Sequence, residues 1–202
     1  MGKNKRSTSF LDTARRMALY FIAYAFVGWM YELFVWIFEE HSLMNRGFLF
    51  GPWLPIYGFG GLILYLTVCP SAKKPMNVSI FGKEFNVRPA VVFILITVCA
   101  AAVELVSTYI MDALGVDWTA LWQYGDYRLN FDRRIALLPA IKFGILGCII
   151  IYLCQDRINR FVGEDAKRIR IFQYILIILF AVDVVFHIRT GSHYTDIPVL
   201  YF

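Results

Sequence analysis

Long apolar runs separated by short polar segments dominate the chain. A helix needs about 20 apolar residues, at about 1.5 Å each, to cross about 30 Å of hydrocarbon. Four runs have this length, at residues 17–38, 89–111, 135–154 and 171–188. The pattern therefore predicts four membrane-spanning helices.

A fifth apolar run, residues 59–69, is too short to span, because it reaches only about 17 Å as a helix. The preceding GFLFGPWLPIYG stretch is also apolar, but its prolines remove backbone donors and its glycines weaken a helix. We therefore expect an all-α integral membrane protein, a polytopic bundle of about five transmembrane helices. Its second helix is broken by glycine and proline in the outer half, and residues 1–202 form a single membrane domain.

The composition supports this class, since 59% of the 202 residues are hydrophobic and only 17% are charged. Soluble domains carry about a quarter charged residues. A disordered chain and a nucleic-acid-wrapping chain are excluded, and an ordinary soluble enzyme is disfavoured. The net charge of +5 is modest, so the positions of the basic residues are more informative than their number.

The distribution of Lys and Arg predicts the topology, because cytoplasmic loops carry an excess of both. Fourteen of the 20 basic residues fall on the side of the N-terminus, five on the opposite side, and Lys142 lies within a span. The N-terminus is predicted inside and the C-terminus outside, in a multi-pass plasma-membrane protein. The first run is too long for a cleavable signal peptide. The predicted cytoplasmic parts are a basic, amphipathic lead-in (1–16), a loop that could form a β-hairpin (70–88) and a basic loop (155–170); residues 115–134 form an outer loop.

Four ionisable residues lie within predicted spans, where charge is costly and usually faces a partner or a water-filled path. They are Glu32, Glu104, Lys142 and Asp183. The predicted topology places all four in the outer half of the bilayer, at the level of the glycine- and proline-broken segment. A shared polar site explains this common depth, and structural ion pairs that hold the bundle together are the alternative.

Helical spacing adds detail to this site. Thr97, Ala101, Glu104, Thr108 and Asp112 recur at steps of three or four and form one stripe. The broken segment resembles the interrupted helices of transporter binding sites, although a plain proline kink would leave the same pattern. In the outer loop, arginines oppose the topology bias and so require local partners or an anionic ligand. Its Trp and Tyr residues could instead form an interfacial belt.

At these residues the chain resembles the ABC-transporter type IV family, also called CmpB-like permeases. The resemblance lies in GWMYE (28–32), in NRGFLFGPWLPIYGFG (45–60), in the span of Glu104, and in the pattern of Asp126, Tyr127, Asn130, Arg134 and Ile135. The chain departs from the pattern at Arg133, where the family tends to have glycine. The resemblance implies a permease-like membrane protein. No GxxxxGK[ST] phosphate loop is present, so any ATPase would be a separate chain.

We therefore predict a small transporter or permease with a polar substrate pocket in the outer half of the bilayer. The candidate substrate-binding residues are Trp29, Glu32, Arg46, Gly51, Pro52, Pro55, Tyr57, Glu104, Asp126, Tyr127, Asn130, Arg134, Lys142 and Asp183. The carboxylates suit a cation, proton or amine, and Arg46 and Arg134 suit an anionic head group. Expected partners are membrane lipids, further copies of the chain and a separate ATPase subunit, with no nucleic acid.

Two other functions stay open. One is a membrane enzyme acting on a lipid or lipid-linked substrate at the outer leaflet, with paired carboxylates as acid and base. It is less favoured, because the chain shows no Ser/His/Asp arrangement. The other is a noncatalytic membrane subunit of a transport complex. The four cysteines have no CxxC spacing and no histidine cluster beside them, so no metal site is predicted. No catalytic residue and no cofactor are predicted either.

Overall fold

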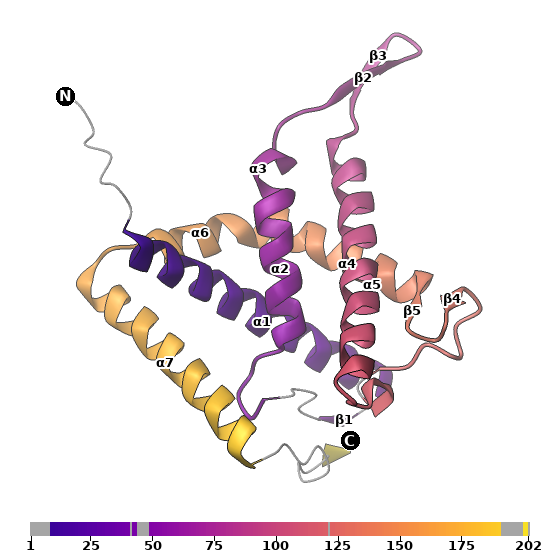
Figure 1. Ribbon diagram of the computed structural model, residues 1–202. Helices are drawn as coiled ribbons and strands as arrows, with labels where there is room; N and C mark the ends of the chain where they lie inside the picture. Colours follow the sequence, from indigo (N-terminus) through magenta and orange to yellow (C-terminus); the bar gives the residue numbers. More distant parts are fainter. Residues whose placement is uncertain (1–8, 41, 44–48, 121, 191–199, 202) are drawn as a thin grey trace, which may run out of the picture. The chain divides into compact units, whose positions relative to one another are not determined.

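A computed structural model describes residues 9–40, 42–43, 49–120, 122–190 and 200–201. Figure 1 labels the helices and strands of the chain, which divides into two compact units that we describe separately. The first unit comprises residues 1–62 and 157–202, and the second comprises residues 63–156.

Helices make up most of the described chain. They are α1 (Phe10–Glu40), α2 (Pro55–Thr67), α3 (Cys69–Ala72), α4 (Arg88–Ala113), α5 (Leu137–Ile149), the π-helical turn η2 (Ile150–Cys154), α6 (Gln155–Gly163) and α7 (Lys167–Thr190). Four continuous helical stretches are long and apolar enough to cross a membrane: Phe10–Val35, Arg88–Ala113, Leu137–Gly163 and Lys167–Thr190. The predicted all-α polytopic membrane class is confirmed.

The predicted break before the fifth apolar run is also confirmed. Residues 51–54 are not helical, and α2 begins only at Pro55. Proline is favoured at the first position of a helix, where its missing N–H is not needed. With 13 residues, α2 reaches about 20 Å, which is short of a full crossing.

In the first unit, α1 and α7 pack around the segment that precedes α2. Ile22 and Ala25 of α1 form a buried cluster with Leu49 and Trp53. The Leu54 N–H donates to the Ala25 carbonyl at 3.0 Å, so this non-helical segment obtains a backbone bond from α1. Such compensation is required where backbone groups at membrane depth leave a helix.

A buried polar network holds the beginning of α1 against the turn between α6 and α7. Arg15 is only 5% exposed; it donates to the side chains of Asp12 and Gln173. Gln173 in turn donates to the Phe161 carbonyl at 2.5 Å. Asp12 also accepts from Arg170 at 3.3 Å. A buried charge held on several sides fixes the elements that supply its partners.

The second unit is built on the contact between α4 and α5. A Cβ at Gly147 would lie 2.5 Å from Cγ2 of Ile96, and one at Gly144 would overlap Thr97. The two glycines therefore allow α5 to approach α4 closely, as small residues do in membrane bundles. Val92 and Ile96 of α4 also belong to a buried apolar cluster with Val68, which lies between α2 and α3.

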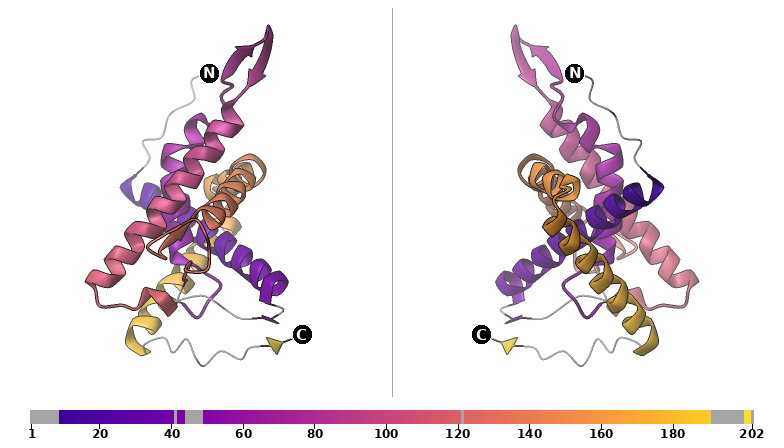
Figure 2. Two further views of the ribbon diagram at one scale, coloured as in Figure 1. Left: turned by 90° about the vertical axis from the view of Figure 1, so that its right-hand side faces the viewer. Right: turned by 90° about the vertical axis from the view of Figure 1, so that its left-hand side faces the viewer.

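A short β-hairpin occupies the predicted loop of residues 70–88. Strands β2 (Asn77–Ile80) and β3 (Lys83–Asn86) pair in an antiparallel register that leaves Phe81 and Gly82 as the two-residue turn. Both have positive φ, 51° and 75°, as a type I′ turn requires. Figure 2 shows this hairpin projecting beyond the first turn of α4.

The remaining strands are short. Strand β1 (Ser42–Leu43) pairs with β6 (Leu200–Tyr201), and β4 (Asn130–Phe131) pairs with β5 (Ile135–Ala136). A 3₁₀ turn, η1 (Trp118–Ala120), lies in the segment that joins α4 to β4.

Candidate functional site

In the first unit, Glu32 lies on α1 and accepts a short hydrogen bond from the Tyr57 hydroxyl of α2. One turn earlier on α1, a Cβ at Gly28 would overlap the Tyr57 ring, so only glycine leaves room for this approach. The Tyr57 ring also lies 6.2 Å from that of Tyr31. GWMYE and GPWLPIYG, two motifs of the family resemblance, therefore pack directly on each other.

Asp183 of α7 holds the non-helical segment that precedes α2. Its carboxylate accepts from the N–H groups of Phe50 at 3.1 Å and Gly51 at 2.8 Å, and from the Trp53 indole at 3.0 Å. A Cβ at Gly51 would lie 2.9 Å from the same carboxylate oxygen, so the close approach depends on glycine. Asp183 thus supplies the acceptor that the broken backbone needs.

In the second unit, the predicted polar stripe of α4 faces α5 and the loop of residues 115–134 that follows α4. Glu104 is 7% exposed and accepts a hydrogen bond from the Tyr124 hydroxyl at 2.7 Å. Thr108, one turn further along, is completely buried. Thr97 lies against Gly144 at the other end of the stripe. The stripe is therefore a protein-facing surface of α4 rather than a lipid-facing one.

Arg134 joins the loop of residues 115–134 to the end of α4. Its guanidinium bonds Asp112 at 2.6 Å and Asp132 at 2.8 Å, and lies 4.6 Å from the Tyr109 ring centroid and 4.8 Å from that of Trp118. The hydrogen bond to Asp132, followed by that to Asp112, raises the pKa of Arg134, which stays charged. Two carboxylates thus supply the local partners that this arginine was expected to need.

The other family-pattern residues of this loop form a compact turn. The Tyr124 and Tyr127 rings meet edge to face at 5.7 Å. Asn130 donates to the Tyr127 carbonyl at 2.6 Å and accepts from the Arg133 N–H at 3.1 Å. Asp126, by contrast, is exposed. These contacts order the chain around Tyr124, the residue that holds Glu104.

The departure from the family pattern at Arg133 has a structural consequence. Asp132 and Arg133 are the central residues of a turn closed by the Arg134 N–H donating to Phe131, and both have positive φ, 51° and 58°. A type I′ turn of this kind favours Asp-Gly. The glycine of the family pattern therefore matches a left-handed position that Arg133 adopts at a cost.

Replacing Arg133 with glycine is expected to stabilise the protein. A left-handed residue costs about 1–2 kcal/mol when it carries a Cβ. Removing this cost stabilises the folded state, but glycine also has more conformational entropy to lose on folding. The expected net gain in the free energy of unfolding is about 0.5–1 kcal/mol. Thermal unfolding in detergent should show a higher midpoint for Arg133→Gly. Arg133→Ala removes the same charge but keeps Cβ, so an equal rise in that variant would contradict the explanation.

Another ordered feature of the loop lies at Asp117, just before η1. Its carboxylate accepts from the Thr119 hydroxyl at 2.6 Å and from the Thr119 N–H at 2.9 Å. These bonds lower the pKa of Asp117 below its usual value. The short turn is thus fixed by its own side chains rather than by a distant partner.

The remaining candidates are distributed as follows. Trp29 is half-buried with its ring 6.1 Å from that of Phe26, and Lys142 is half-buried on α5. Pro52 lies in the segment held by Asp183, and Pro55 begins α2. Arg46 lies outside the described residues. The expected common depth of the four charges compares residues of both units and stays a prediction.

Two residues that hold buried charged side chains, Tyr124 beside Glu104 and Gln173 beside Arg15, were not among the predicted site residues. Tyr124 was considered only as part of the aromatic loop, and no spacing rule connects it to Glu104 twenty residues earlier. Gln173 was missed although a signal was present: it is a polar residue inside the apolar run 171–188. Among the described residues, no group of three or more His, Cys, Asp or Glu side chains is placed to hold a metal ion.

Four helical stretches that are long and apolar enough to cross a membrane, together with a short helix that begins after a break, define a polytopic membrane protein. The family described as "Putative ABC-transporter type IV" matches residues 19–188, and the chain belongs to it. The match covers the Glu32, Glu104 and Asp183 contacts described above. No curated protein and no solved structure matches the chain.

Proposed function

We propose that the protein is the membrane-embedded permease of a transporter and that Glu32 contributes to its substrate site. The observation that carries this proposal is the position of Glu32. It is held by Tyr57 where α1 packs against the start of the broken helix α2. Interrupted helices lie at substrate sites in transporters because their backbone is irregular where it lines a cavity.

Glu104 is the corresponding candidate in the second unit. It also lies on a helix able to cross a membrane and is also held by a tyrosine hydroxyl. Carboxylates at membrane depth are costly, and a cation or a proton offsets that cost. The substrate class we propose is therefore a small cationic or amine-bearing solute.

The energy source we propose is a separate ATPase subunit. The family supports this assignment, and the sequence contains no phosphate loop of its own. The complex would lie in the plasma membrane, with lipids around the exposed apolar faces of α4 and α7. Val98 of α4 and Val182 of α7, 62% and 60% exposed, are examples of such lipid-facing positions.

Uptake of radiolabelled ethanolamine, choline and spermidine into cells expressing the chain with its ATPase tests this proposal. At least one amine should accumulate above the level of cells lacking the chain, and an excess of the unlabelled amine should suppress the signal. Equal accumulation with and without the chain for all three would overturn the proposed substrate class.

A further inference from the structure

A second polar site lies in the first unit, at the turn between α6 and α7. A shallow cavity of about 320 Å³, open to the outside, is lined by Arg157, Arg160, Phe161 and Glu164 of α6 and its following turn, and by Ile169 of α7. The first four residues are three or four positions apart and so share one face. None of them belongs to the candidate substrate site.

The framework of this cavity is fixed by hydrogen bonds. Glu164 accepts from the N–H groups of Asp165 and Ala166, both at 3.1 Å, which orders the turn. Gln173, completely buried, donates to the carbonyl of Phe161 and joins this turn to Arg15 of α1. The backbone of this turn is therefore fixed by contacts within the protein.

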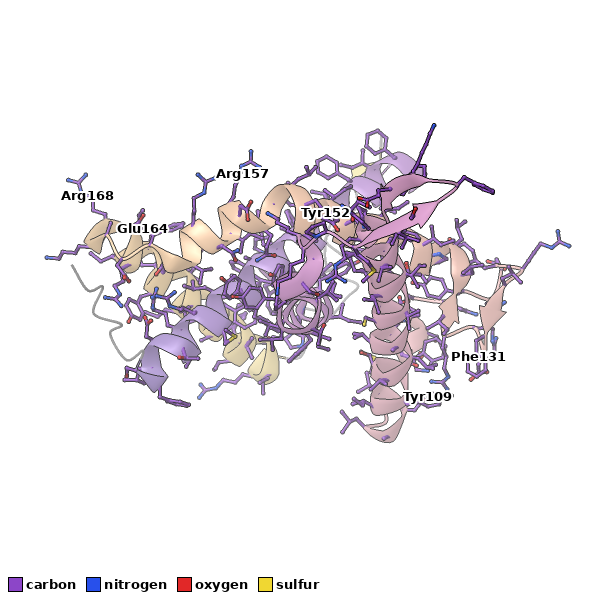
Figure 3. All side chains as sticks on the ribbon, turned by 90° about the horizontal axis from the view of Figure 1, so that it is seen from above. Tyr109, Phe131, Tyr152, Arg157, Glu164 and Arg168 are labelled. Atoms are coloured by element: carbon purple, nitrogen blue, oxygen red, sulfur yellow. The ribbon has the colours of Figure 1, made fainter. Side chains whose placement is uncertain are left out.

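The charge of this turn favours an anion. Two arginines and one glutamate line the cavity, and Asp156 and Asp165 lie beside them in the sequence. A guanidinium presents a planar set of donors that matches two phosphate oxygens at once. Across residues 155–170, five basic residues outnumber three acidic ones, which leaves a net charge of +2. Figure 3 shows Arg157 and Arg168 extending away from the ribbon.

An apolar track leads from the cavity onto α7. The ring of Phe161 lies 6.2 Å from that of Phe172, which is 51% exposed. Ile175, three residues further along the helix, is 46% exposed. A ligand with a charged head and an apolar tail would satisfy both the arginines and this track.

We propose that the cavity binds the headgroup of an anionic phospholipid of the phosphatidylglycerol class. Its phosphate lies between Arg157 and Arg160, a headgroup hydroxyl donates to Glu164, and acyl methylenes pack on Phe161 and Phe172. The negative charge of this lipid complements the excess of basic residues in the turn, whereas a zwitterionic headgroup brings no net charge to offset it. An acidic segment of a protein partner would match the charge but leave the apolar track uncovered. The turn is predicted to lie on the cytoplasmic side of the membrane. Basic segments on that side are attracted to the anionic lipids of the adjacent leaflet.

Native mass spectrometry of the full chain in detergent, titrated with phosphatidylglycerol or phosphatidylcholine, tests the site. The wild-type chain should retain phosphatidylglycerol preferentially. The double variant Arg157→Gln, Arg160→Gln should bind it about tenfold more weakly, because charged hydrogen bonds are lost. Arg168→Gln removes another exposed arginine, one that does not line the cavity, and the lipid affinity of this variant should stay within about twofold of wild type. An equal loss in Arg168→Gln, or equal retention of both lipids, would overturn the proposal.

Additional measurements distinguish the lipid from a free phosphate and from a protein partner. Glycerol 3-phosphate that displaces the lipid at comparable concentration would overturn the lipid assignment in favour of a free phosphate. Unchanged lipid binding by the double variant together with loss of ATPase co-purification would show a protein interface instead. Arg160→Lys keeps the charge and guards against misfolding of the double variant. It should bind the lipid with intermediate affinity, and wild-type affinity would contradict the role of the guanidinium.

Discussion

Replacing Glu32 with glutamine is expected to reduce amine uptake about ten- to a hundredfold, which is the effect of losing one charge-assisted hydrogen bond. Glutamine keeps an oxygen that accepts from the Tyr57 hydroxyl, so the contact between α1 and α2 should persist. Expression and thermal midpoint should therefore stay close to wild type. The measurement is initial uptake at low amine concentration, normalised to the amount of chain in the membrane.

Two further variants make the Glu32 experiment specific. Glu84→Gln removes a carboxylate from the β2–β3 hairpin, where it is exposed, and should leave uptake unchanged. Tyr57→Phe keeps the ring against Gly28 but removes the hydroxyl, and its uptake should fall less than that of Glu32→Gln. Normal uptake by a normally expressed Glu32→Gln variant would remove Glu32 from the substrate site.

The helical class could be predicted because it depends on patterns within single elements. Apolar run length gave the four spanning stretches, and the prolines at 52 and 55 gave the break before α2. The stripe on α4 followed from helical spacing, and the burial of Glu104 and Thr108 agrees with it. Each of these signals is contained in a window of about two dozen residues or fewer.

The partners of the charged residues could not be predicted, because they come from distant parts of the chain. Tyr57 lies 25 positions from Glu32, and Gly51 lies 132 positions from Asp183. Neither distance has a periodicity that a single sequence shows. The sequence marked these charges as residues that need partners, but it left open which groups would supply them. The conformation of a local turn leaves a clearer signal in the sequence. The family pattern has glycine at position 133, and this fits the positive φ that Arg133 adopts.

Asp183 shows what this limit means for function. From its depth alone, it was grouped with the substrate carboxylates. The structure shows that three donors from the segment before α2 converge on it, and the substrate role stays a prediction. A carboxylate used in this way positions the broken helix, and its contribution to any substrate site passes through Gly51 and Trp53.

Replacing Asp183 with leucine is accordingly expected to destabilise the protein by roughly 3–5 kcal/mol, since three donors lose their acceptor at about 1–3 kcal/mol each and partial rearrangement recovers some of it. The midpoint of thermal unfolding in detergent should fall by roughly 10 °C. Asp183→Asn keeps one acceptor oxygen and should give a smaller decrease. Val182→Leu, at the neighbouring lipid-facing position, should change nothing. An Asp183→Leu variant as stable as wild type would mean that these three bonds do not hold the segment. If the anchor role is correct, uptake should fall in proportion to the loss of folded protein in Asp183→Asn, whereas Glu32→Gln should lose uptake while remaining folded.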